Sequence, residues 1–183
     1  GSSGSSNTDS GVTQRVFGTL LNWMQERNKD ELIYVIATVN RIESLPPELL
    51  RKGRFDEIFW VDLPSKTERE EILKIHLSKR NQDTALGKKG WSSVLSASTN
   101  FSGAELESAV EDAMFSAFYE DRDAVNSDDL TKSLSSTFPL AQTMSTDIQR
   151  NRDWAFTNCR MAQESEPEEV VEVSSQSKRK VVI

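Results

Sequence analysis

Two short apolar runs, residues 32–39 and 58–63, limit most narrowly what this chain can fold into. The first run is rich in β-branched residues and almost unbroken, which is typical of a strand buried on both faces. Pro46-Pro47 predicts a short helix over residues 48–51, and Pro64 stops the second run. This strand–helix–strand order predicts part of a parallel sheet, and therefore an α/β fold.

Polar side chains that suit phosphate chemistry follow the first predicted strand. Asn40 stands at its tip, where an amide can hold a water molecule or a phosphate oxygen, although it can equally cap a turn. Arg51 and Arg54 flank Gly53 in the next predicted turn. Each guanidinium is a forked, permanently charged donor that can reach a partner's phosphate. Loop arginines are also commonly solvated charges that contribute little, so the arginines alone do not decide the function.

The chain from Ser65 onward has helical periodicity up to about residue 162. Ser65 with Glu68, and Ser102 with Glu105, form two capping boxes that predict helix starts. Apolar residues at helical spacing follow these starts: Ile72, Leu73, Ile75 and Leu77 in the first helix, and Leu106, Ala109, Val110, Ala113, Met114, Ala117 and Phe118 in the second. Similar patterns predict further helices over residues 12–26, 91–98, 128–135 and 146–162.

Charge and composition exclude several classes of function. The 183 residues carry a formal net charge of −7, which argues against a general binder of nucleic acid or anionic membranes, because phosphate groups require clustered cations. No apolar run approaches the length of a membrane span. The single cysteine, Cys159, cannot form an internal disulfide, which suits a reducing compartment. One histidine and one distant cysteine cannot supply a zinc site, so no resident metal is expected from these residues.

The sequence contains no phosphate-binding loop of the form G-x-x-x-x-G-K-[ST]. Its Gly87-Lys88 pair lacks both the upstream glycine and the following serine or threonine. An acidic pair after a four-residue apolar strand, which metal-ion activation of water needs, is also missing. The sequence therefore carries polar residues suited to contacting a phosphate, but neither a phosphate-binding loop nor an acidic pair that could position a metal ion.

Asn40, followed by the run Arg51-Lys52-Gly53-Arg54-Phe55-Asp56, resembles the second region of homology of the AAA ATPases. In that resemblance Asn40 corresponds to the sensor-1 asparagine, and Arg51 and Arg54 correspond to the arginine-finger pair. Lys52 stands where the family commonly has proline. The wording of VFGTLLNWMQ and WAFTNCRMA is most similar to the AAA ATPases of cyanobacteria and algal plastids.

Two downstream segments resemble the part of the family's module that contacts the base. The run from Ile72 to His76 is similar to the segment that places an apolar residue and a histidine near adenine and ribose. A lone histidine on a helix is nevertheless more often a packed or surface residue. Gly103 and Ala104 match the lid turn, the sensor-2 region, where small residues let the backbone approach the base; they can also simply begin a helix.

The resemblance implies the rear part of a P-loop NTPase αβα sandwich, followed by an all-helical AAA lid domain. The expected segments are a flexible Gly/Ser-rich stretch over 1–11 (the family's loop or an expression-tag remnant), the end of the nucleotide-binding α/β domain over 12–64, the lid over 65–139, a helical extension over 140–163 and a disordered acidic tail over 164–183. In this fold the strand leading to the phosphate loop lies between the two predicted strands, so they are not expected to pair with each other.

The resemblance also implies a function. ATP with Mg²⁺ would bind between the lid and a phosphate loop outside this sequence, and Arg51 and Arg54 would complete the pocket of a neighbouring subunit in a ring homo-oligomer, a hexamer. The intact protein would hydrolyse ATP to remodel a protein or a protein complex in the cytoplasm or the plastid stroma, whereas this chain alone would be inactive. A non-catalytic AAA-like assembly or interaction module is the alternative.

Overall fold

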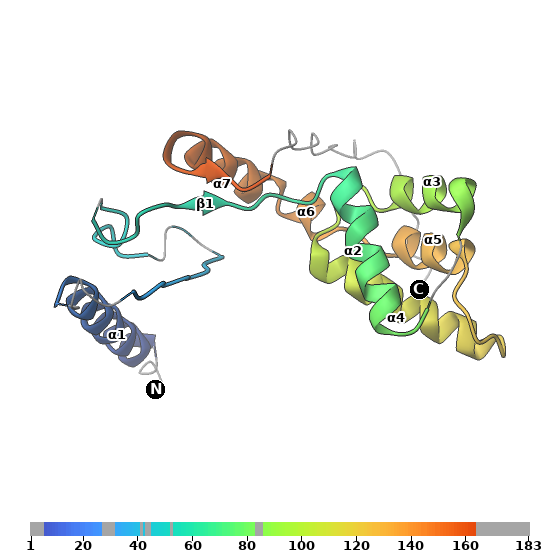
Figure 1. Cartoon of the computed structure of the whole chain (residues 1–183), viewed down its shortest axis with the longest axis horizontal. Helices are drawn as coiled ribbons and strands as arrows, with labels where there is room; N and C mark the ends of the chain where they lie inside the picture. Colours follow the sequence, from blue (N-terminus) through green and yellow to red (C-terminus); the bar gives the residue numbers. More distant parts are fainter. Residues whose placement is uncertain are drawn as a thin grey trace, which may run out of the picture. The chain divides into compact units, whose positions relative to one another are not determined.

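The computed structural model describes residues 6–26, 32–40, 42, 45–51, 53–82 and 86–163, with side chains from residue 15 onward. Its elements are α1 (Ser6–Glu26), β1 (Phe59–Trp60), α2 (Lys66–Lys79), α3 (Gly87–Ala97), α4 (Gly103–Tyr119), α5 (Ser127–Ser136), α6 (Leu140–Thr143), α7 (Ser145–Asn158) and β2 (Arg160–Met161), as Figure 1 shows. The chain divides into two compact units, Gly1–Ile58 and Phe59–Ile183. No helix in the described ranges combines the length and the apolar character needed to cross a bilayer.

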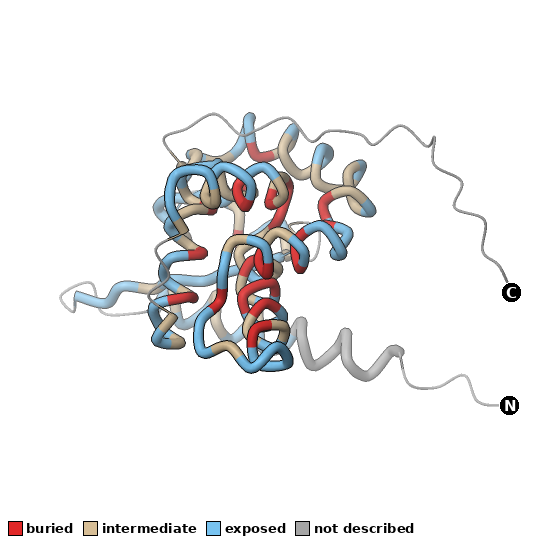
Figure 2. The backbone as a smooth tube through the Cα atoms, turned by 90° about the vertical axis from the view of Figure 1, so that its right-hand side faces the viewer, coloured by how far each residue is buried: buried red, intermediate tan, exposed pale blue. Residues whose placement is uncertain are grey.

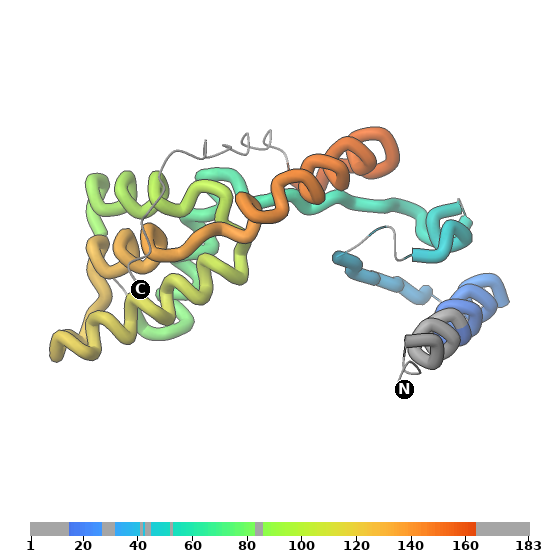
Figure 3. Tube along the Cα trace, turned by 180° about the vertical axis from the view of Figure 1, so that it is seen from behind, coloured from blue at the N-terminus to red at the C-terminus, as the bar shows by residue number. Residues whose placement is uncertain are grey.

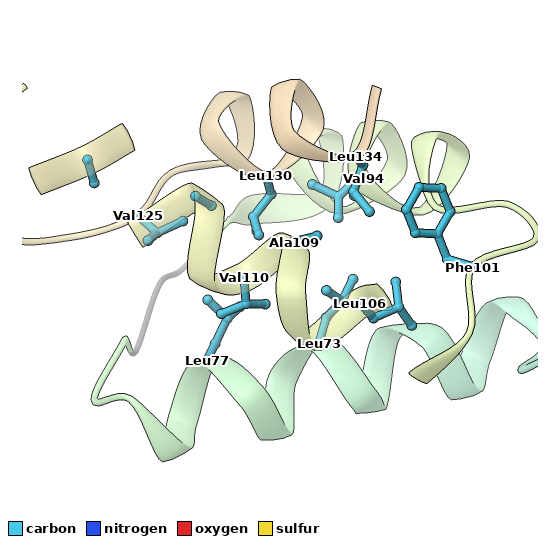
Figure 4. Packing of buried hydrophobic residues seen from close by; sticks show 12 residues of the cluster. Leu73, Leu77, Val94, Phe101, Leu106, Ala109, Val110, Val125, Leu130 and Leu134 are labelled. Atoms are coloured by element: carbon cyan, nitrogen blue, oxygen red, sulfur yellow. The ribbon is translucent and has the colours of Figure 1, made fainter. Parts of the chain in front are cut away.

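The hydrophobic core of the second unit lies among α2, α3, α4 and α5. Helix α4 packs against α2 and α5, and α3 packs against α5 and α2. Figure 4 shows Leu73 and Leu77 of α2 pointing toward Leu106 and Val110 of α4. The fully buried cluster comprises Leu73, Leu77, Val94, Phe101, Leu106, Ala109, Val110, Ala113, Ala117, Val125, Leu130 and Leu134. Each buried leucine or valine stabilises the fold by about 1.5–3 kcal/mol, so this cluster is the main source of stability in the unit.

Both predicted capping boxes are confirmed. Ser65 precedes α2, where its amide donates to Glu68 Oε2 at 2.8 Å and its hydroxyl accepts from the Glu68 amide. Ser102 precedes α4 and has the same reciprocal bonds with Glu105. The Ser65 amide holds the pKa of the Glu68 carboxyl below its usual range. These caps satisfy orphan amides at each helix start, which is why both starts were readable from local sequence.

Two apolar side chains assigned to the core by periodicity are outside it. Phe118, expected on the buried stripe of α4, is 80% exposed, and Ile75 of α2 is 50% exposed. The buried residue beside Phe118 is Ala117, and because successive helical residues point about 100° apart, Phe118 lies on a different face of α4. Figure 2 shows this division along the helices, with buried and exposed positions alternating around each turn.

The C-terminal region differs from the single helix expected over 146–162. Helices α6 and α7 are followed at Cys159 by an extended residue, and Arg160–Met161 then forms strand β2. Strand β2 pairs in parallel with β1, with Phe59 opposite Arg160 and Trp60 opposite Met161. Figure 3 shows these segments side by side although they are far apart in the sequence. The expected strand over 58–63 is thus only two residues long, and its partner comes from the C-terminal extension.

A buried ion pair anchors this C-terminal region, and no local pattern in the sequence indicated it. The Arg152 guanidinium of α7 donates to both carboxylate oxygens of Asp62, with Nε–Oδ2 and Nη2–Oδ1 distances of 2.8 Å. Only 2% of the Asp62 side chain is exposed. Gln163 adds an amide bridge: its Oε1 accepts from the Asp62 amide and its Nε2 donates to the carbonyls of Asp62 and Leu63. We call Arg152, β2 and Gln163 the C-terminal strap.

The first unit contains helix α1, an extended segment and a turn region. Helix α1 begins at Ser6, so residues 6–11, which were expected to be flexible, are helical in this structure. The expected helix over 12–26 is extended toward the N-terminus, because adding a residue to an existing helix is far easier than nucleating one. Residues 32–39 belong to no strand or helix in the described part of the chain, and Leu32, Tyr34 and Ile36 are exposed. The expectation of a doubly buried strand is therefore wrong for this structure, since burial requires neighbouring strands. Residues 47–50 form turns rather than a helix.

We predict that Arg152→Ala strongly destabilises the second unit. Truncation leaves the Asp62 carboxylate buried without its partner, which costs on the order of 3 kcal/mol. Urea unfolding of the 183-residue chain, followed by far-UV circular dichroism, measures the change in the free energy of unfolding.

Arg150→Ala is the matched control, since Arg150 lies on the same helix with a side chain 65% exposed and a partner, Asp147, that is 50% exposed. Such surface pairs contribute less than about 1 kcal/mol. Equal effects of the two substitutions would contradict the structural role given to Arg152.

Candidate functional site

The arginine turn of the first unit is built by prolines and by one glycine. The Leu49 amide donates to Pro46 O, and the Arg51 amide donates to Glu48 O, so the turn is held by short-range backbone bonds. Gly53 has φ of +93°, a conformation that L side chains rarely adopt, and this explains glycine between the two arginines.

The two arginines of the turn have different environments. Arg54 is partly buried, and its Nη1 donates to the Glu48 carbonyl, which folds this side chain back on its own turn. Arg51 is exposed. Asn40 is also exposed, at the end of the extended segment. The turn therefore presents Arg51 to solvent while it restrains Arg54.

The residues expected near adenine lie in the second unit, and two of them are neighbours. A Cβ built on Gly103, the first residue of α4, would lie 3.9 Å from Ile72 Cδ1 of α2. Ile72 also packs against the buried cluster. Ala104, the next residue of α4, is exposed. The turn before α4 thus meets an apolar side chain of α2 with little side-chain bulk between them.

His76 lies one helical turn beyond Ile72 and belongs to a cluster of charged residues between α2 and α4. Its Nδ1 lies 3.2 Å from Glu107 Oε1. Arg80 Nη2 donates to the same Glu107 oxygen at 3.0 Å and also to Glu111 Oε1. The donated bonds of Arg80 hold the pKa of the Glu107 carboxyl below its usual range. The cluster therefore keeps an ionised carboxylate against the imidazole.

The roles of Arg80, Glu107 and Glu111 were not recognised in the sequence. A signal existed, since Arg80 follows His76 by four residues and Glu107 precedes Glu111 by four, so each pair shares one helix face. Which faces meet depends on how α2 packs on α4, and that is a tertiary property.

The predicted site residues are thus divided between the two units. Asn40, Arg51 and Arg54 belong to the first unit, and Ile72, His76, Gly103 and Ala104 belong to the second. In the described ranges, no three His, Cys, Asp or Glu side chains are grouped so that they could hold a metal ion. Cys159 is partly buried, and burial raises the pKa of its thiol.

One family model and two relatives of known sequence are similar to parts of this chain. Residues 1–63 match the family model described as "ATPase family associated with various cellular activities (AAA)". An uncharacterized AAA domain-containing protein, ycf46, of Guillardia theta is 48% identical over 154 residues, which is 81% of this chain and 29% of that protein. The ATP-dependent zinc metalloprotease FtsH of Mycoplasmopsis synoviae is 33% identical over 113 residues, or 62% of this chain and 17% of that protein. The chain spans less than a third of either relative.

A solved structure supports the fold. The structure titled "Crystal structure of FIGL-1 AAA domain in complex with ADP" matches 66% of this chain and 43% of its own chain, with a TM-score of 0.56 and 16% identity. The expected fold class, a P-loop NTPase α/β fold with a helical lid, is confirmed by this likeness, by the helices of the second unit and by the small parallel sheet.

We predict that Gly103 is not needed for folding. Its φ is not positive and the nearest atom to an added Cβ is at an ordinary contact distance, so Gly103→Ala should raise the free energy of unfolding by about 0.5 kcal/mol, because alanine has less freedom in the unfolded chain. Thermal and urea unfolding measure the change.

Gly90→Ala on α3 is the contrasting control. There a Cβ would lie 2.9 Å from Ser127 Cβ, so the substitution should destabilise the unit by about 1–3 kcal/mol. A large loss of stability in Gly103→Ala would mean that this glycine has a structural role.

Proposed function

Because this chain belongs to the AAA family of ATPases, we propose that it forms the rear part of an AAA module that couples ATP binding and hydrolysis to the remodelling of a protein or protein complex. The observation that carries this proposal is the meeting of Ile72 with Gly103, one turn before His76. These residues come from two separate sequence segments and were expected, from resemblance alone, at the same end of the nucleotide.

The second unit has the features of a binding surface for the adenine end of ATP. Ile72 offers apolar contact to a base, and His76 offers a ring nitrogen to the base or the ribose. Gly103 and Ala104 leave room for a base to approach the backbone at the start of α4, since, apart from the adjoining chain, Ile72 Cδ1 is the one atom of the described residues within 4 Å of a Cβ built on Gly103. The residues present therefore fit this end of the cofactor.

The phosphate end requires residues that this sequence does not contain. A phosphate-binding loop and an acidic pair, Walker A and Walker B, are absent from the 183 residues, so ATP phosphates and Mg²⁺ would be held by another part of the intact protein. Asn40 would sense the γ-phosphate and the attacking water. The relative named an ATP-dependent metalloprotease supports ATP as the nucleotide.

Arg51 and Arg54 would act on the nucleotide of a neighbouring subunit. A positioned guanidinium neutralises the charge that develops on the transferred phosphoryl group, and it contributes about 10³–10⁵ in rate in other NTPases. Arg51 is exposed and therefore accessible to a partner, whereas Arg54 would have to release the Glu48 carbonyl or act while bonded to it. Fingers that act in trans imply a ring of identical subunits, which we propose is a hexamer. The proposed location of this ring is the cytoplasm or the plastid stroma.

The second candidate function is a non-catalytic AAA-like assembly or interaction module, and it applies if the gene encodes only these 183 residues, since they contain neither Walker motif. In that case the lid and the arginine turn would serve subunit contacts alone. The reading frame of the gene separates the two candidates, because an upstream G-x-x-x-x-G-K-[ST] and an apolar strand ending in Asp-Glu belong only to the ATPase.

We predict that the isolated 183-residue chain does not hydrolyse ATP. It lacks the loop that holds the β- and γ-phosphates and the acidic residues that position Mg²⁺. A coupled assay of phosphate release with purified chain should remain at the background rate, and steady turnover would contradict the proposal.

In the intact protein, we predict that Arg54→Ala lowers kcat by about 10³-fold while ATP affinity stays near its original value, because a finger stabilises the transition state and not the bound ground state. Turnover and the binding of a fluorescent ATP analogue are measured in parallel. Arg15→Ala, an exposed arginine of α1, is the control and should leave both unchanged. Loss of ATP binding in Arg54→Ala would identify Arg54 as a structural residue.

A further inference from the structure

His76 has one ring nitrogen engaged by the protein and one that is not. The side chain is 14% exposed, and Nδ1 faces the Glu107 carboxylate at 3.2 Å. Nε2 has no hydrogen-bond partner among the residues that the structure describes, and it is not a fully buried unsatisfied atom. Nε2 is therefore at least partly accessible to solvent.

Two neighbours place opposite demands on Nδ1. Glu107 Oε1 is an acceptor and requires an N–H, whereas Arg80 Nη1, at 3.4 Å, is a donor and requires a lone pair. The tautomer decides between them, because a neutral imidazole carries its proton on only one nitrogen.

The Glu107 carboxylate is the more favourable partner for His76 Nδ1. Arg80 already donates to Glu107, to Glu111 and to the His76 carbonyl at 3.3 Å, so its guanidinium is satisfied without the ring. Glu107 stays ionised because the bond from Arg80 lowers its pKa. A lone pair on Nδ1 would face this negative oxygen directly and would be repelled, whereas an N–H there makes a charge-assisted bond.

We propose that Glu107 is a positioning residue that fixes His76 in the tautomer protonated at Nδ1, so that Nε2 presents a lone pair to a hydrogen-bond donor of the nucleotide. The donor is an N–H or O–H group, either the amino group of adenine or a ribose hydroxyl. This inference rests on the proposed function, since it assigns the chemistry of the same adenine-end surface. Arg80 keeps Glu107 charged and in place, and Glu111 shares Arg80 without lying against the ring.

The tautomer can be read directly, because His76 is the only histidine in the chain. Two-bond ¹H–¹⁵N correlation spectra of the 183-residue chain are recorded at about pH 8.5, where free histidine is neutral, and again at higher pH until the signals stop moving. We expect a protonated Nδ1 and an unprotonated Nε2, the reverse of the form that free histidine favours in water. An Nε2-protonated ring in the unaltered chain overturns the inference.

Glu107→Ala and Glu111→Ala form a matched pair of variants. Both remove a carboxylate partner of Arg80 from the exposed side of α4, but only Glu107 contacts the imidazole. We expect Glu107→Ala to shift the tautomer toward protonation at Nε2, because the remaining neighbour of Nδ1 is then Arg80, a donor that requires a lone pair. We expect Glu111→Ala to leave the tautomer unchanged. The same response in both variants contradicts a specific role for Glu107.

In the intact protein the functional consequence is a loss of affinity of about fivefold for ATP in Glu107→Ala, the effect of one hydrogen bond, with no loss in Glu111→Ala. Comparing ATP with purine riboside triphosphate, which lacks the amino group of adenine, and with 2′-deoxy-ATP and 3′-deoxy-ATP identifies the donor, since the effect of Glu107→Ala disappears for the analogue that lacks it. An unchanged ATP affinity in Glu107→Ala overturns the inference.

His76→Ala separates this inference from the proposed function. If His76→Ala weakens ATP binding but the unaltered ring is protonated at Nε2, the positioning by Glu107 is wrong and the nucleotide surface stands. If His76→Ala binds ATP normally, the assignment of His76 to the nucleotide surface is itself wrong.

Discussion

The second unit depends on satisfying one buried carboxylate. Asp62 lies between the segment that leaves the first unit and the start of the helical core, and an ionised group in that position is costly unless it is fully paired. Arg152 supplies a forked guanidinium and Gln163 supplies an amide that both donates and accepts. Because Gln163 also reaches Glu68, the same strap joins the N-terminal cap of α2 to the end of the described chain. The beginning of the unit and the end of its described part are thereby held at one place.

The helical core could be predicted largely from sequence because its signals are local. A capping box lies within four residues and an apolar stripe repeats every three or four, so α2 and α4 were expected close to their observed bounds. The wrong predictions on these two helices concern individual apolar residues that were expected to be buried and are exposed. Phe118 and Ile75 are exposed apolar residues, and the apolar periodicity alone does not say which edge of a stripe a neighbouring helix covers.

The strands and the strap could not be predicted because their causes are distant in sequence. Arg152 and Asp62 are 90 residues apart, and β2 is a two-residue strand with no propensity signal of its own. Residues 32–39 have the composition of a buried strand, yet composition states only a preference for a pleated, covered surface, and the described residues provide no such cover. For the candidate site, the family resemblance placed Ile72 and Gly103 at the same end of the nucleotide, whereas their contact and the role of Glu107 entered only through the packing of α2 on α4.

The strap also determines how tension would pass through the molecule. Strand β2 and Gln163 are the last described parts of the chain. Both form hydrogen bonds with residues 59–63, the segment that precedes α2. A pull exerted at Gln163 therefore acts first on β1, on Asp62 and Leu63, and on the N-terminal cap of α2, without first being transmitted across the hydrophobic core. Tension at this end of the described chain would load the start of α2 before it reached the packed faces of the helices.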